Sequence, residues 1–171
     1  MRRNPDSGFT LIELLVVVAI FGIVMAIAMP GLMRARMAGN EASAIASLRA
    51  INSSQINFAV NCGLGYYADS LAGLSLAPLG GEGFISADLS TDPSVKSGYV
   101  VRMAGGPAPG FAIMPCTAAT LSVSYAANGD PVAIGSSGGR YFFTNSGTIW
   151  EDPNPIAAVQ TGPPATGTAI Q

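Results

Sequence analysis

The chain opens with a short polar segment that is followed by a long apolar run. Residues 14–33 contain no charged residue, and Glu13 lies just before them. At a rise of about 1.5 Å per residue, a helix of this length covers roughly 30 Å, the thickness of the hydrocarbon core of a bilayer. A cleaved secretory signal has a shorter apolar stretch with small residues after it. The pattern therefore predicts a retained membrane-spanning helix over residues 9–33.

A second pattern follows, in which apolar residues return at helical spacing among polar ones. Over residues 34–60 they fall on one helical face, seven, four, three and seven positions apart: Met37, Ala44, Leu48, Ile51 and Phe58. This stripe predicts an amphipathic half-helix that packs on a folded head. The segment NCGLG at 61–65 carries the asparagine and glycines that end helices.

Beyond this helix the pattern predicts a β-rich head. Residues 61–97 form an irregular αβ-loop, with a short helix expected near 67–74. Strand-like runs follow at 98–103, 111–115, 121–127, 140–144 and 147–151. AGGPAPG separates the first two runs and NSG the last two, so both pairs are predicted to form hairpins. We therefore predict an α+β fold, with an antiparallel sheet of about four strands over 98–151 laid on the half-helix.

The tail, residues 152–171, differs from the head in composition. It is rich in Pro, Ala, Gly and Thr, and such a segment buries too little apolar surface to order itself. We expect a low-complexity, extended or loosely docked surface segment rather than an added edge strand.

Composition and charge exclude several functions. Of the 171 residues, 49% are apolar and 11% charged, the net charge is −2, and histidine is absent. The net charge argues against a nucleic-acid partner, which needs clustered basic residues. The lack of histidine excludes a His-based triad, a His general base and most zinc or haem sites. No glycine-rich phosphate loop precedes a helix. We therefore expect this protein to be no enzyme and to bind no cofactor.

The first residues carry a specific motif. The leader MRRNPDSG, followed by FTLIELL and the apolar helix, resembles the class III signal of type IV pilins and type II secretion pseudopilins. The resemblance implies that residues 1–8 are a leader, that a membrane peptidase cuts between Gly8 and Phe9, and that the same enzyme methylates Phe9. Basic residues lie on both sides of the span, so charge alone leaves its orientation undecided. The resemblance places the leader in the cytoplasm.

Glu13 becomes the fifth residue of the mature chain, where this family carries a glutamate. A charged residue within a span usually has a function and a partner. Cleavage creates an ammonium on Phe9, and the resemblance implies that Glu13 accepts this amine from a neighbouring subunit during assembly. The alternative is an interfacial glutamate that snorkels to the headgroups. Gly22 and Pro30 match the helix-weakening positions of many pilins; either the helix between them extends in a filament, or Pro30 only kinks it.

Cys62 and Cys116 are too few for a four-thiolate metal site. In a head outside the cytoplasm we predict a disulfide between them, the alternative being two separate buried thiols. The bond would close a loop of about 55 residues and stabilise the head by roughly 4 kcal/mol. Many pilins place a disulfide near the C-terminus instead, so the recognition role of that loop does not transfer to this chain.

Two further sets of residues are candidates for binding. Major pseudopilins bind calcium in the head, and the acidic candidates here are Glu82, Asp88, Asp92, Asp130, Glu151 and Asp152. They lack EF-hand spacing, and turns with helix caps account for them equally well, so we predict no metal site. The aromatic residues of the head, which could suggest a stacking surface or an electron-transfer path, are predicted to be core: Tyr66, Tyr67, Tyr99, Tyr125, Tyr141, Phe142, Phe143 and Trp150.

The resemblance implies a structural subunit of a type IV pilus-like extracellular filament for adhesion, motility or surface attachment. The alternative is a pseudopilin whose periplasmic pseudopilus exports proteins, and a third is a membrane-anchored binding module that never polymerises. The implied partners are further copies in a helical filament, the prepilin peptidase and an inner-membrane assembly platform. The implied location is the inner membrane, with one span and the head outside the cytoplasm, and later the pilus or pseudopilus.

Overall fold

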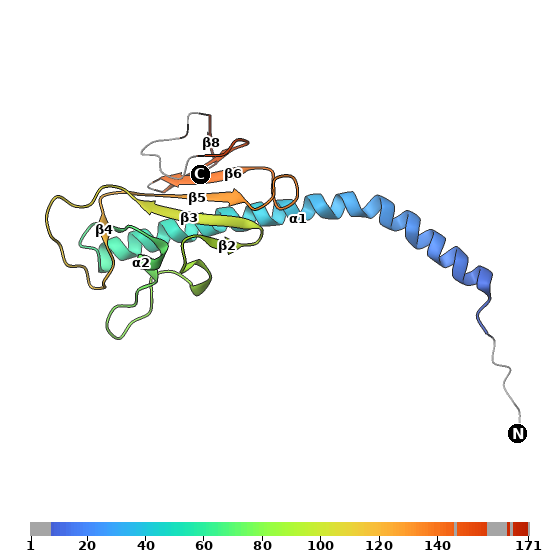
Figure 1. Ribbon diagram of the computed structural model, residues 1–171, viewed down its shortest axis with the longest axis horizontal. Helices are drawn as coiled ribbons and strands as arrows, with labels where there is room; N and C mark the ends of the chain where they lie inside the picture. Colours follow the sequence, from blue (N-terminus) through green and yellow to red (C-terminus); the bar gives the residue numbers. More distant parts are fainter. Residues whose placement is uncertain (1–7, 146, 157–163, 165, 171) are drawn as a thin grey trace, which may run out of the picture. The chain divides into compact units, whose positions relative to one another are not determined.

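The computed structural model describes residues 8–145, 147–156, 164 and 166–170. The first seven residues of the predicted leader and part of the tail, residues 157–163, 165 and 171, therefore lie outside the described residues. The chain divides into two compact units, Met1–Arg36 and Met37–Gln171. Helix α1 (Leu11–Asn61) contributes to both units (Figure 1), and each unit is described by itself below.

Helix α1 confirms the predicted long helix and its end. Both Gly22 and Pro30 lie inside this helix. The chain then turns away at Leu64 and Gly65, which have positive φ angles of 54° and 92°. The amide of Gly65 donates to the carbonyl of Ala59 at 2.9 Å and so satisfies one of the carbonyls that the end of the helix leaves unpaired.

The head contains one six-stranded antiparallel sheet in the order β2-β3-β5-β6-β7-β8 (Figure 1). Its strands are β2 (Ser94–Lys96), β3 (Tyr99–Gly105), β5 (Tyr125–Pro131), β6 (Tyr141–Asn145), β7 (Thr148–Asp152) and β8 (Thr168–Ala169). A separate antiparallel pair joins β1 (Tyr67–Ala68) and β4 (Leu121–Ser122). The αβ-loop also contains α2 (Leu71–Ser75), close to the predicted short helix, and the 3₁₀ turn η1 (Ala87–Leu89).

The four central strands of the sheet, β3, β5, β6 and β7, correspond to four of the five predicted runs. The hairpin between β6 and β7 is confirmed, with Asn145 opposite Thr148 and Phe143 opposite Trp150. The predicted α+β fold is therefore correct. The sheet is wider than predicted because the short strands β2 and β8 extend it at its two edges.

The predicted strand at 111–115 is wrong, and so is its hairpin with β3. Residues 106–120 contain no helix or strand, and β3 pairs with β5 instead. Pro107, Pro109 and Pro115 lack the amide hydrogen that a strand ladder needs. Phe111 and Met114 are 65% and 89% exposed, so this segment has no buried face that would fix it as a strand.

The described part of the tail is more closely docked than predicted. The amide of Ile170 donates to the carbonyl of Ile149 at 2.9 Å, and β8 lies beside β7 as an edge strand, which corrects our expectation. Ile156 is buried on the sheet with Ala126 and Phe143. The composition of the tail did not indicate these contacts, because they depend on a few apolar residues and on backbone pairing.

The head core lies between the buried face of α1 and the sheet. Four of the five stripe residues are buried at 2% exposure or less: Ala44, Leu48, Ile51 and Phe58. The same face carries buried polar residues that the stripe did not reveal. The Gln55 carboxamide donates to the carbonyl of Ala68 at 2.8 Å and accepts from its amide at 3.0 Å. Gln55 therefore holds β1 on the helix as a neighbouring strand would.

Most of the predicted core aromatics are buried. Tyr99, Tyr125, Phe142 and Phe143 are at most 3% exposed. The others are half-buried at the margins of the core or of the smaller cluster around Phe143: Tyr66, Tyr67, Tyr141 and Trp150. Their positions favour packing over a continuous stacking surface.

Candidate functional site

The N-terminal segment, residues 8–36, exposes nearly all of its apolar side chains. From Phe9 to Met33 the large apolar side chains are 44–81% exposed. Helix α1 contains an 18-residue window that is long and apolar enough to cross a membrane, and none of that window is buried. A soluble monomer rarely exposes so large an apolar surface, so this surface needs lipid or another protein against it.

The helix begins at a reciprocal cap made by Thr10 and Glu13. The hydroxyl of Thr10 donates to Glu13 Oε2 at 2.7 Å, and the amide of Thr10 donates to the same oxygen at 3.0 Å. The amide of Glu13 in turn donates to Thr10 Oγ1 at 3.4 Å. This is the capping box, in which a threonine and a glutamate three residues later satisfy each other's free backbone donors.

The predicted processing residues lie immediately before this cap. Gly8 and Phe9 are exposed and outside the helix, which starts at Leu11. The peptide bond between them is therefore in a non-helical, accessible part of the chain, where proteolysis is easiest. The predicted assembly residue, Glu13, lies in the first turn of the helix.

Gly22 and Pro30 lie within the exposed part of the helix. A Cβ atom added to Gly22 would meet no atom within 4 Å. Packing inside this chain therefore does not require glycine at this position. Two other reasons for a glycine at this position are that glycine weakens the helix by about 1 kcal/mol relative to alanine, and that it allows another molecule to approach the helix closely.

The predicted disulfide is present between Cys62 and Cys116, which are 54 residues apart. The amide of Cys116 also donates to the carbonyl of Cys62 at 3.2 Å. The bond ties the irregular segment 106–120 to the end of α1. The rings of Tyr66 and Phe111, 6.2 Å apart and edge-on, add a second contact between these parts.

The acidic residues considered for calcium are dispersed. Among the described residues, no three His, Cys, Asp or Glu side chains lie close enough to hold a metal ion. Asp88 pairs with Lys96 at 2.5 Å, and hydrogen bonding to this lysine lowers the pKa of Asp88. Burial raises the pKa of Asp92 and of Asp130, and the latter pairs with Arg102 at 3.0 Å.

The other three acidic candidates are also apart from one another. Glu151 pairs with Arg140 at 2.5 Å. Asp152 accepts from the amide of Asn154 at 2.7 Å and from the hydroxyl of Thr166. Glu82 is exposed in the αβ-loop. Asp92 accepts from the amide of Met103 at 3.3 Å, so five of the six carboxylates have structural partners within the head.

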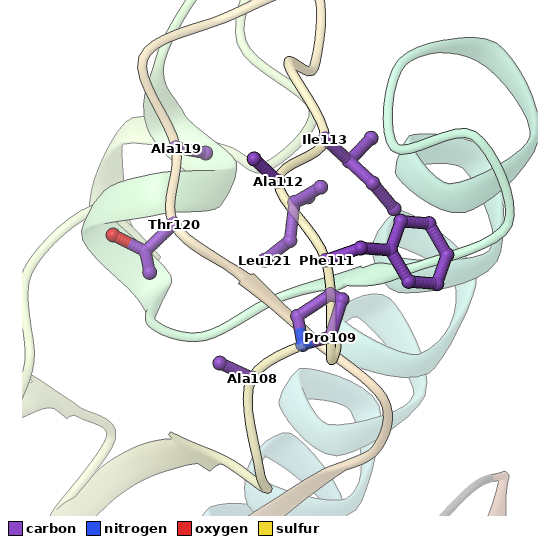
Figure 2. Close-up of a pocket in the computed structure, with 8 residues that line it drawn as sticks. All are labelled: Ala108, Pro109, Phe111, Ala112, Ile113, Ala119, Thr120 and Leu121. Atoms are coloured by element: carbon purple, nitrogen blue, oxygen red, sulfur yellow. The ribbon is translucent and has the colours of Figure 1, made fainter.

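A small hollow of about 230 Å³ lies in the head beside the segment 106–120. Figure 2 shows the eight residues that line it, among them Phe111, Ile113 and Leu121, with the Thr120 hydroxyl as a polar group. None of these residues is charged. The hollow lacks the convergent polar groups that orient a specific ligand, so the N-terminal segment is the stronger candidate site.

Our sequence reasoning missed the role of Thr10. The signal was present, because TLIE at 10–13 has the spacing of a capping box directly before an apolar run. The charge of Glu13 alone does not indicate this cap. The structure shows that the carboxylate already has a partner in its own chain.

Comparisons with known proteins agree with the position of this site. Residues 3–29 match the family model described as "Prokaryotic N-terminal methylation motif". The start of the chain therefore carries the prokaryotic N-terminal methylation motif.

The chain is also similar to the type IV major pilin protein PilA of Myxococcus xanthus, with 43% identity over 58 residues. The aligned part is 33% of this chain and 26% of that protein, so the similarity spans about a quarter of the relative's length. No solved structure gives a significant match to this chain.

Proposed function

We propose that this chain is the structural subunit of a type IV pilus-like extracellular filament. In this proposal the prepilin peptidase cuts after Gly8 and methylates Phe9. Before assembly the subunit is anchored in the inner membrane, with its head outside the cytoplasm. An assembly platform then moves it into a helical filament of further copies. The methylation motif and the similarity to a major pilin support the proposal.

The observation that carries the proposal is the exposed apolar surface of residues 9–33 with one carboxylate at its start. A bilayer covers this surface in the unassembled subunit. In a filament the same surface packs against the helices of other copies, so assembly replaces lipid contacts with protein contacts. An unpaired carboxylate in hydrocarbon costs a few kcal/mol, and pairing Glu13 with the Phe9 ammonium of another copy would favour docking and help to fix the axial register.

Deleting the gene tests the proposal against its alternative. Loss of surface fibres and of the adhesion or motility that depends on them supports the pilus. Normal fibres with exported proteins trapped in the periplasm would support a type II secretion pseudopilus instead.

Replacing Glu13 tests the polymerisation step itself. Glu13→Ala and Glu13→Val subunits should be cleaved and methylated normally, yet fail to assemble or assemble poorly. Unchanged function of cells that make only these variants would contradict the proposal and favour a membrane-anchored module that does not polymerise.

A further inference from the structure

The capping box at the start of α1 engages the Glu13 carboxylate through one oxygen. Both donors of Thr10, the hydroxyl at 2.7 Å and the amide at 3.0 Å, point to Oε2. Thr10 therefore leaves Oε1 available to another donor. The carboxylate is held at the N-terminal end of the helix, within hydrogen-bond distance of the residue that follows Phe9.

A free glutamate side chain has three rotatable bonds, and fixing them costs conformational entropy. A group that is already fixed in its binding orientation avoids this cost when the partner arrives. The hydroxyl of Thr10 supplies that restraint, because it donates to the carboxylate and accepts from the amide of Glu13.

We propose that Thr10 is a positioning residue for assembly, which holds the Glu13 carboxylate in the orientation that accepts the Phe9 ammonium of another copy. This inference rests on the proposed function, because it presumes that Glu13 acts in polymerisation. It assigns to Thr10 an effect that passes through the charge of Glu13, beyond the stabilisation of a helix end.

Four variants of the full chain separate an effect of Thr10 through the charge of Glu13 from its stabilisation of the helix end. Thr10→Val has nearly the shape of threonine but lacks the hydroxyl, and Thr10→Ser retains the hydroxyl. Glu13→Gln keeps the hydrogen bonds of a capping box, which accepts Glu or Gln, but removes the charge. The fourth variant combines Thr10→Val with Glu13→Gln.

Each variant is co-expressed with the wild-type subunit, and mass spectrometry measures the variant-to-wild-type ratio in sheared filaments. This ratio is divided by the same ratio in the pool of cleaved subunits in the membrane. The division removes any effect on synthesis or cleavage. The same digests report whether Phe9 is the methylated N-terminus.

Thr10→Val should lower incorporation about fivefold to tenfold, the size expected for the net contribution of one hydrogen bond. Thr10→Ser should remain within about twofold of wild type. Glu13→Gln should lower incorporation more than tenfold, and adding Thr10→Val should change that value by less than about twofold, because the two changes act through one group.

Incorporation of Thr10→Val at the wild-type ratio would overturn the inference. So would an equal loss in Thr10→Ser, or an effect of Thr10→Val that persists in full in the Glu13→Gln background. The last result would mean that Thr10 only caps the helix. Normal incorporation of Glu13→Gln would contradict the role of the Glu13 charge in assembly, whereas filaments that lack the wild-type chain would contradict the proposed function itself.

Discussion

The two units of this chain use apolar residues in opposite ways. In the head, apolar residues of α1 alternate with polar ones at helical spacing, and the apolar face is buried against the sheet. In residues 9–33 the apolar side chains lie all around the helix, and none of the apolar window is buried. The head therefore satisfies its apolar surface within the chain, whereas the N-terminal segment depends on surroundings that other molecules provide.

The same contrast holds for polar groups. Buried polar atoms of the head include pairs that are far apart in the sequence, as Asn52 with Thr144 at 2.9 Å and with Tyr125 at 3.0 Å. In the N-terminal segment the carboxylate of Glu13 is bound by Thr10, three residues away. Changes in one unit should therefore affect assembly, and changes in the other should affect folding.

The largest effect is expected from a charge in the N-terminal segment. Val18 is 62% exposed there, and Val132 on the head is 58% exposed, so the two valines form a matched pair. Val18→Arg places a charge where the proposal has lipid or another helix, at a cost of about 3 kcal/mol on insertion scales. Filament yield should fall tenfold or more, with the thermal unfolding of the head unchanged.

Val132→Arg is the control for this prediction. An exposed surface substitution usually changes stability by less than about 0.5 kcal/mol, and the variant should assemble. Equal losses of filament yield from both arginines would contradict the contrast between the two units.

The next largest effect is expected from the disulfide. Replacing Cys62 and Cys116 together by serine should lower the free energy of unfolding of the head by about 4 kcal/mol, because the unfolded chain loses the closure of a long loop. Chemical denaturation of the full chain in detergent micelles measures this change. A loss below about 1 kcal/mol would contradict the stabilisation expected from closing this loop.

A smaller loss is expected at Gln55, which is fully buried. Gln55→Leu leaves the amide and carbonyl of Ala68 buried without their partner, at a cost of about 2–3 kcal/mol. Ser53→Leu, on the exposed side of the same helix, should change stability by less than about 0.5 kcal/mol. If the two variants unfold at the same denaturant concentration, the hydrogen bonds of Gln55 do not hold β1 on α1 as we describe.

The smallest effect concerns pH and the Glu41–Arg140 pair, whose atoms are 2.6 Å apart. Burial raises the pKa of Glu41, but hydrogen bonds from Arg140 and from the Gly139 amide outweigh burial and hold this pKa below its usual value. A lowered folded pKa contributes stability above the unfolded pKa, about 4.3 for glutamate, and the contribution is lost as the pH falls through the folded pKa.

Glu41→Gln should therefore be less stable than wild type by about 0.5–1 kcal/mol at neutral pH, a modest value because Arg140 is partly exposed. The difference should shrink below about pH 4. Burial raises the pKa of Asp92 and Asp130. The wild type and Glu41→Gln both contain these two residues, so their contribution to the pH dependence cancels in the stability difference. A difference that widens at acid pH would contradict the sign of this argument.

The features that periodicity and local chemistry determine were predictable. The long helix, its stop after Asn61 and the buried positions at Leu48, Ile51 and Phe58 follow from spacing and from glycine and asparagine. The disulfide was predictable once the head was placed outside the cytoplasm. The capping box of Thr10 and Glu13 was equally readable, since it needs only four consecutive residues.

The features that depend on distant partners were not predictable. Residues 111–115 have the composition of a strand, but nearby prolines and the absence of a buried face override that tendency. Gln55 is polar within an apolar stripe, and only the position of Ala68 explains its burial. Strand β8 exists because β7 offers a free edge, which local composition cannot reveal.

The central claim is that the N-terminal segment is processed and becomes the contact surface between copies. Mass spectrometry of filaments sheared from the cell surface tests this claim most directly. The account predicts a peptide that begins at Phe9, carries one methyl group on its amino nitrogen and lacks residues 1–8. Filaments without this chain, or a chain that retains its leader in the filament, would contradict it.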